Sequence, residues 1–212
     1  MRDGGYWVER AVSLGFTRAG WIDASRLTFE NAEVFRGYCA QNTCGTYNAC
    51  WTCPPGVGPV KHCIGKIRGY GRALLAQYEE EAPPSGAVGS TANPADAAAP
   101  GSRGTAASGR PDANAEHVRE ANIDRVRVRF KSLMAEFAPG IGAEFPGMLP
   151  LGSGGCKICP ECAYPRDPCR HPDLMIQSVS AYCIDAGQAC GLAGLPCWRD
   201  GFVSFTGMFF VY

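Results

Sequence analysis

One short segment constrains this chain more than any other: residues 156–169, which read CKICPECAYPRDPC. The segment holds four cysteines in fourteen residues, and the first three, Cys156, Cys159 and Cys162, are spaced three apart. Three cysteines at this spacing cannot all pair within the loop, and each would need a distant partner with its Cα atom ~4.4–6.8 Å away. Disulfides, a zinc ion, an iron–sulfur cluster and a reactive thiol each predict something different about the rest of the sequence.

The chain has twelve cysteines in 212 residues. Whether they form disulfides or stay as free thiols depends on the redox compartment of the protein. The N-terminal residues, MRDGGYWVERAVSLGF, lack the continuous apolar core of a signal peptide. No apolar run approaches the ~20 residues that a membrane span requires. We therefore expect a cytoplasmic protein with no membrane partner, in which reduced thiols bind metal or take part in redox chemistry rather than form disulfides.

Charge and motif content argue against several other functions. Lys and Arg total 20, as do Asp and Glu, so the formal net charge is zero and there is no basic excess to bind nucleic acid. The sequence contains no P-loop, no G-x-G-x-x-G and no evident Ser/His/Asp set. His62 and His171 adjoin cysteines. Each could be a simple exposed residue or could donate a hydrogen bond near a bound metal. We expect no nucleic acid partner, and we identify no catalytic residues.

Composition divides the chain into two cysteine-containing parts. Residues 82–113 form a low-complexity segment in which 24 of the 32 residues are Ala, Pro, Gly or Ser. Such a segment cannot bury enough apolar surface to offset the entropy lost on ordering. We predict a disordered insertion there, between an N-terminal part, 1–81, and a C-terminal part, 114–212, that together form one domain.

Apolar periodicity predicts an α+β fold. Residues 115–138 carry the strongest helix pattern, because large apolar residues recur there every three or four positions, and Pro139-Gly140 is expected to end the helix. Shorter helices are expected at residues 5–14 and 59–69, and strands at 16–23, 72–79 and 202–212. The prediction is a small sheet of three to four strands with helices packed on it and two cysteine-rich metal or cluster loops at one end.

The spacing within residues 156–169 favours an iron–sulfur cluster over zinc. Zinc often takes its four thiolates from two C-x2-C knuckles, and a third cysteine directly after one knuckle is less usual for it. The bacterial ferredoxin run C-x2-C-x2-C-x3-C-P wraps a cubane with a cysteine at every third residue. In this chain the last spacing, from Cys162 to Cys169, is x6 instead of x3. Zinc therefore stays the alternative.

A second group of cysteines lies in residues 39–63, CAQNTCGTYNACWTCPPGVGPVKHC. It contains a C-x2-C at Cys50 and Cys53, which in other proteins can be a thioredoxin-like redox pair. That motif needs a helix that starts at the cysteines, and Pro54-Pro55 would break such a helix. A second metal or cluster site, shielded by Trp51, is the favoured interpretation.

Three motifs of this chain also occur together in a known family. They are C-x4-C-x2-Y-x3-W-x-C-P-P over residues 39–55, followed by Cys63; GCKICPECAYPRDPCRHP over residues 155–172; and SVSAYCID over residues 178–185. With these motifs the chain resembles the predicted metal-binding family catalogued as domain of unknown function 2284. The resemblance covers nearly the whole chain outside the low-complexity segment, and it implies a cytoplasmic protein that binds iron–sulfur clusters.

The resemblance also implies a ligand set of eight thiolates, the number needed by two four-iron clusters or two zinc ions. The first site would use Cys39, Cys44, Cys53 and Cys63, and the second Cys156, Cys159, Cys162 and Cys169. The remaining cysteines, Cys50, Cys183, Cys190 and Cys197, lie outside the family pattern. At Cys183 the family pattern leads us to expect glycine.

These observations predict an iron–sulfur protein that carries two 4Fe-4S clusters and works in electron transfer or redox metallocofactor chemistry with a redox partner protein. Two other functions stay open at this point. One is a zinc-stabilised interaction module, and the other is an enzyme or assembly factor with one exposed cluster. The residues do not decide whether the protein is an enzyme, nor its oligomeric state.

Overall fold

The computed structural model describes residues 4–82 and 113–212, with side chains described from residue 120 onward in the second range. The segment predicted as a disordered insertion lies outside the described residues, apart from its two end residues. The proposed division into 1–81 and 114–212 therefore stays a prediction. The strands on the two sides of the insertion nevertheless belong to a single sheet.

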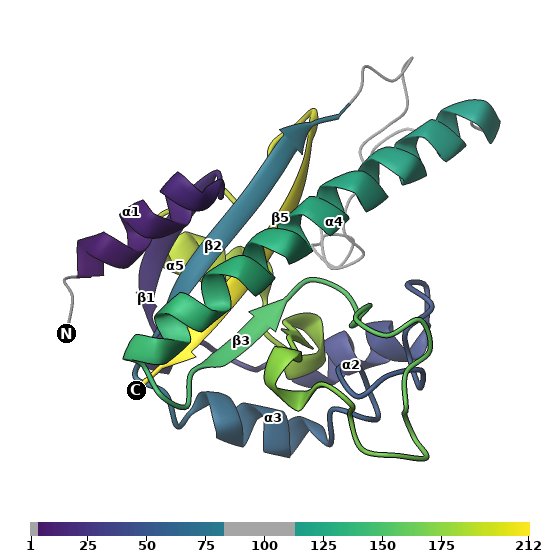
Figure 1. Ribbon diagram of the computed structural model, residues 1–212, viewed down its shortest axis with the longest axis horizontal. Helices are drawn as coiled ribbons and strands as arrows, with labels where there is room; N and C mark the ends of the chain where they lie inside the picture. The colour runs from purple at the N-terminus through teal and green to yellow at the C-terminus, as the bar shows by residue number, and fades with distance from the viewer. Residues whose placement is uncertain (1–3, 83–112) are drawn as a thin grey trace.

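The fold is α+β, as expected, and its centre is a five-stranded mixed sheet of order β1-β2-β5-β3-β4 (Figure 1). The strands are β1 (Arg18–Asp23), β2 (Arg72–Glu81), β3 (Leu149–Gly152), β4 (Gln177–Ser178) and β5 (Phe202–Val211). All neighbours are antiparallel except β3 and β4, which are parallel. The three strands predicted from the sequence are confirmed as β1, β2 and β5.

The predicted strand number of three to four is wrong, because β3 and β4 were not expected. They have four and two residues, too few for an alternating apolar pattern to be recognised, and β3 contains Pro150. Pairing with β5 places β3 in the sheet, with Leu149 opposite Phe210 and Leu151 opposite Met208. These strands therefore depend on a partner that is distant in sequence.

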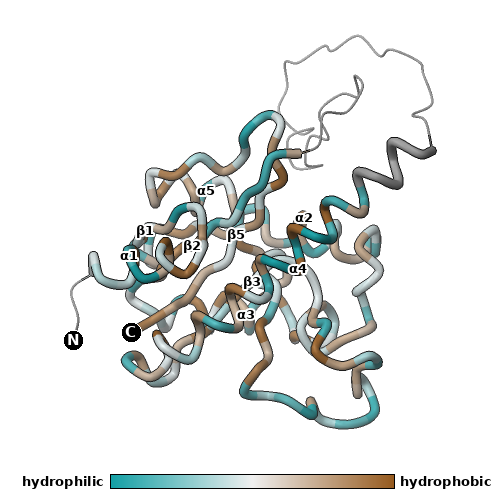
Figure 2. Tube along the Cα trace, turned by 45° about the horizontal axis from the view of Figure 1, so that its top comes forward, coloured by the Kyte–Doolittle hydropathy of each residue, from teal (hydrophilic) through white to brown (hydrophobic). Residues whose placement is uncertain are grey.

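Strands β2 and β5 form the core of the sheet, since all ten residues of β2 pair with β5. The sheet is covered on both faces, so consecutive residues of β2 enter opposite halves of the core. Leu74 packs with the apolar cluster on one face and Leu75 with the cluster on the other. The hydrophobic C-terminal end of β5 is visible in Figure 2. Burial on both faces explains why these strands are almost continuously apolar.

Helices α1 (Gly4–Leu14) and α4 (Ala113–Glu144) cover one face of the sheet, and α3 (Val60–Ile67) and α5 (Ala186–Leu192) pack on the other. Helix α2 (Ala32–Ala40) lies beside α3 on this second side. The helices predicted at residues 5–14 and 59–69 are confirmed as α1 and α3. No helix among the described residues combines the length and apolar character needed to cross a bilayer.

The predicted end of the long helix at Pro139-Gly140 is wrong, because α4 continues to Glu144. Pro139 itself is exposed, while Ile141 and Phe145 are buried in the cluster that includes Trp7 of α1. A proline inside a helix costs ~3 kcal/mol. Burying each of the two apolar side chains contributes about 1.5–3 kcal/mol, which offsets that cost. Tertiary packing thus extends the helix past its local stop signal.

Candidate metal centre

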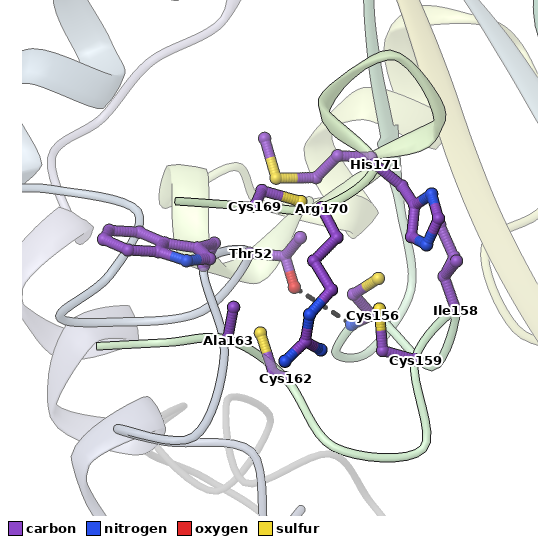
Figure 3. Close-up of a pocket in the computed structure, with 11 residues that line it drawn as sticks. Thr52, Cys156, Ile158, Cys159, Cys162, Ala163, Cys169, Arg170 and His171 are labelled. Atoms are coloured by element: carbon purple, nitrogen blue, oxygen red, sulfur yellow. Dashed lines mark hydrogen bonds between the residues drawn. The ribbon is translucent and has the colours of Figure 1, made fainter. Parts of the chain in front are cut away.

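The two cysteine-rich segments lie against each other although about a hundred residues separate them in sequence. The backbone N–H of Cys156 donates to Oγ1 of Thr52 at 2.9 Å, a bond drawn in Figure 3. Trp51 Nε1 donates to the carbonyl oxygen of Asp167 at 3.0 Å, and its ring meets that of Tyr164 edge-on at 4.9 Å. The first cysteine segment therefore forms one wall of the site, and residues 156–169 form the other.

All four cysteines of residues 156–169 line one small hollow (Figure 3). Each is partly exposed and none is in a disulfide. The other lining residues are Trp51, Thr52, Ile158, Ala163, Arg170, His171 and Met175. The hollow has a volume of about 20 Å³, which is room for little more than one water-sized sphere. The fold therefore brings together the four thiols of the second predicted ligand set.

A positive charge stands among these thiols. The side chain of Arg170 extends between the cysteines in the view of Figure 3, and its Nη1 donates to the carbonyl oxygen of Glu161 at 2.9 Å. On the adjoining side, Lys131 of α4 donates through Nζ to the carbonyl oxygen of Gly155. Burial lowers the pKa of Lys131, and the charges of nearby thiolates, Cys156 among them, oppose that shift. Both cations favour an anionic occupant.

The donor set suits a soft metal. The residues that line the hollow include four cysteines and no carboxylate. Four thiolates select zinc, copper(I) or iron–sulfur clusters over hard cations such as Mg²⁺ and Ca²⁺. Burial raises the pKa of the Cys156 thiol, so a bound metal would be needed to hold it as thiolate at neutral pH. Within the described part of the chain, no three Cys, His, Asp or Glu side chains already stand close enough to share one ion. Binding would therefore draw the sulfur atoms inward from the walls of the hollow.

The cysteines of residues 39–63 fall into two neighbourhoods. Thr46 is the centre of the first, because its Oγ1 hydrogen-bonds Cys44 Sγ at 3.0 Å and accepts from Cys53 Sγ at 3.3 Å. Cys50 joins them, with its Sγ 3.2 Å from Oγ1 of Thr52. Cys50 and Cys53 also hydrogen-bond each other, which lowers the pKa of Cys50 to about 5 and raises that of Cys53. These three cysteines adjoin the loop of Cys156.

Cys39 and Cys63 have different neighbours. Cys39 lies on α2, and Cys63 on α3 is fully buried. Arg36 Nη2 donates to Cys63 Sγ at 3.2 Å. Burial raises the pKa of both thiols, and the charge of Arg36 acts against that rise. The first predicted set is thus divided between two neighbourhoods, with Cys44 and Cys53 at Thr46 and with Cys39 and Cys63 apart from them, and that set stays a prediction. Sequence reasoning gave no weight to Thr46, Thr52 or Arg36, because nothing in the local pattern marks them.

A comparison with protein families bears on these two groups of thiols. The model described as "Predicted metal-binding protein (DUF2284)" matches residues 20–208. The chain belongs to this family. The match confirms the resemblance inferred from the sequence motifs, and the DUF2284 range includes all twelve cysteines. No curated protein and no solved structure shows a significant match to the chain.

One glycine keeps the two cysteine segments of this DUF2284 protein in contact. A Cβ atom on Gly155 would lie 2.6 Å from Cγ2 and 2.8 Å from Cβ of Thr46. We expect Gly155→Ala to push the segments apart, to lower stability by about 1–3 kcal/mol as in other overpacked sites, and to reduce metal content. Thermal unfolding and metal analysis of the purified variant measure both effects.

Gly154→Ala is the matched control. Gly154 has a φ of +74°, so alanine there costs roughly 1–2 kcal/mol of backbone strain, but the nearest atom to the added Cβ is Arg127 Cδ at 4.0 Å. We expect this variant to lose stability and keep its metal. Equal metal loss in the two variants would contradict the role given to the contact between Gly155 and Thr46.

Proposed function

We propose that this DUF2284 protein is an iron–sulfur protein that carries two 4Fe-4S clusters and functions in electron transfer or related redox chemistry. The observation that carries the proposal is the shared hollow, whose walls hold all four cysteines of the C-x2-C-x2-C-x6-C run. A run with a cysteine at every third residue is typical of loops that wrap a cubane. When bound, such a cluster accepts and releases single electrons.

The residues around the hollow have roles that suit this function. Cys156, Cys159, Cys162 and Cys169 would be the thiolate ligands. Thr52 orients the first of them through the backbone N–H of Cys156, and Trp51 restricts the access of water to the site. Arg170 and Lys131 offset the negative charge of a thiolate-bound cluster, which raises its reduction potential.

The second cluster would be held by cysteines of residues 39–63, and a redox partner protein would dock near the partly exposed cysteine loop. Electron transfer to a partner protein requires a short distance between the two redox centres. The four cysteines of residues 156–169 are all partly exposed, so a partner could approach them closely. The protein would act in a reducing compartment such as the cytoplasm, where its thiols stay free to bind metal.

One observation favours zinc as the second candidate. The hollow measures about 20 Å³, which has room for a single ion once the sulfur atoms move inward, whereas a cubane would need the loop to move outward. In that case four thiolates around zinc would stabilise the fold outright, and the function would lie in a surface that docks a partner. Metal identity separates the two candidates.

The decisive experiment is to quantify iron, acid-labile sulfide and zinc in protein purified without oxygen, together with its visible absorption spectrum. Two clusters predict about eight iron and about eight sulfide per chain, with broad absorption that is bleached on reduction. A colourless protein with two zinc ions per chain would overturn the iron–sulfur proposal and support the zinc-stabilised module. A protein without bound metal would overturn both.

A further inference from the structure

Arg36 of α2 lies where three elements that each carry a cysteine pack together. Cys39 is one turn further along the same helix, Cys63 is on α3, and Cys183 caps the 3-10 helix η4 (Ser180–Tyr182). Arg36 Nη2 donates to Cys63 Sγ at 3.2 Å. Burial raises the pKa of the Cys183 thiol, and a hydrogen bond from Arg36 acts against that rise. Helix η4, which ends at Cys183, packs against both α2 and α3, so Cys183 ends an element that touches the helices of Arg36 and Cys63.

The surroundings of Arg36 are poor partners for a cation. Cys63 and Cys183 are 0% and 1% exposed, and a neutral thiol is only a weak hydrogen-bond acceptor. Arg36 Nε is buried and has no hydrogen-bond partner, and among the described residues no carboxylate lies within ion-pair distance of the guanidinium. Arg36 is partly buried, and taking part of a charged group out of water is costly unless it gains a counter-charge. Thiolates would supply one.

The backbone at Cys183 gives an independent reason to assign its thiol a role. Cys183 has φ 59° and ψ 28°, in the left-handed region, which costs a residue with a Cβ roughly 1–2 kcal/mol and costs glycine nothing. Strain of this kind persists where the side chain is needed. Here the side chain is a buried thiol beside Arg36, in a position where we expected glycine.

We propose that the second metal centre is held by Cys39, Cys44, Cys63 and Cys183, with Arg36 as the cation that compensates the bound thiolates. The assignment rests on the proposed function, because it concerns the same class of soft, thiolate-bound metal, in a cluster or as zinc. It replaces Cys53 of the sequence-predicted set by Cys183. Cys53 instead stays in its hydrogen bonds with Thr46 and Cys50 beside the other loop.

Metal binding at this place would give the guanidinium of Arg36 the negative partners that it lacks. The ligands release their thiol protons, and four thiolates on a divalent ion carry a net charge of about −2. The N–H groups of Arg36 then donate to charged sulfur, and charge-assisted bonds are about twice as strong as neutral ones. Cys44 lies in the exposed turn after α2 and hydrogen-bonds Thr46 at 3.0 Å, a contact that it would exchange for the metal. We expect it to close the site.

Two substitutions in the full-length protein, purified without oxygen, test whether Cys183 or Cys53 is the fourth ligand. Cys183→Gly removes the thiol and relieves the left-handed backbone, so a loss of metal cannot be attributed to a failure to fold. We expect Cys183→Gly to bind half the metal of the unmodified protein and Cys53→Ser to bind all of it. Cys190→Ala, which removes another fully buried thiol, is the matched control and should also keep all of it.

A second measurement does not depend on stoichiometry. Alkylation of native protein with N-ethylmaleimide, followed by mass spectrometry, should find Cys44 protected in the unmodified protein and reactive in Cys183→Gly. Full metal content in Cys183→Gly, or halved content in Cys53→Ser, would overturn the assignment. Unmodified protein without any bound metal would instead overturn the proposed function, so the two failures are distinguishable.

Discussion

Removal of the metal by a chelator is expected to lower the melting temperature of the protein by roughly 10–20 °C or more. Thiolate-bound zinc in small domains contributes about 10–16 kcal/mol of apparent binding free energy, against a total domain stability of about 5–15 kcal/mol. A loss of only about 5 kcal/mol already gives this shift, since each kcal/mol corresponds to roughly 2–4 °C in a domain of this size.

The structure predicts where the loss of order occurs. The apolar cluster between the sheet and helices α1 and α4 contains no cysteine, whereas the cluster on the opposite face includes Cys63 and packs against η4, which ends at Cys183. Hydrogen exchange should therefore accelerate after chelation in residues 39–63 and 153–183 and stay slow in β2, β5 and α4. Restored protection when the metal is returned is the control. Unchanged melting and exchange in metal-free protein would contradict a structural role for the metal.

Cys169→Ser is expected to remove or damage one of the two proposed metal centres and leave the other intact. Cys169 is separated from the C-x2-C-x2-C run by six residues, yet its side chain lines the same hollow as the other three cysteines. If all four thiolates are ligands, this variant should lose as much iron or zinc as Cys159→Ser. Metal content and visible absorption after oxygen-free purification measure the loss.

The comparison of these two variants also separates the proposed roles. If Cys159→Ser loses the centre and Cys169→Ser keeps it, three cysteines suffice as ligands and one metal position is open. That result would contradict four-thiolate ligation and favour an enzyme or assembly factor with an exposed cluster. Cys197→Ser, at a partly exposed cysteine outside both proposed sites, is the control and should keep both centres.

Local sequence patterns were sufficient for the elements that stabilise themselves by their own apolar face. The helices at residues 5–14 and 59–69 and the three longer strands follow directly from such patterns. Local patterns gave the wrong answer where packing against distant residues outweighs local preference. The last turn of α4 is an example, because it continues beyond Pro139 owing to the burial of Ile141 and Phe145. Local patterns also failed for β3 and β4, which are too short to have a pattern of their own.

The candidate sites divide in the same way. Residues 156–169 carry four cysteines within one loop, so their spacing alone indicates that they act together, and the fold places them around one hollow. The packing of Arg36, Cys63 and the helix that ends at Cys183 could not be predicted from spacing, because the three residues belong to three elements brought together by the fold. The sequence by itself was sufficient for membership of a predicted metal-binding family and for the α+β class. Only the tertiary structure decided which thiols are neighbours, since proximity across elements is set by the sum of contacts in the core rather than by any local motif.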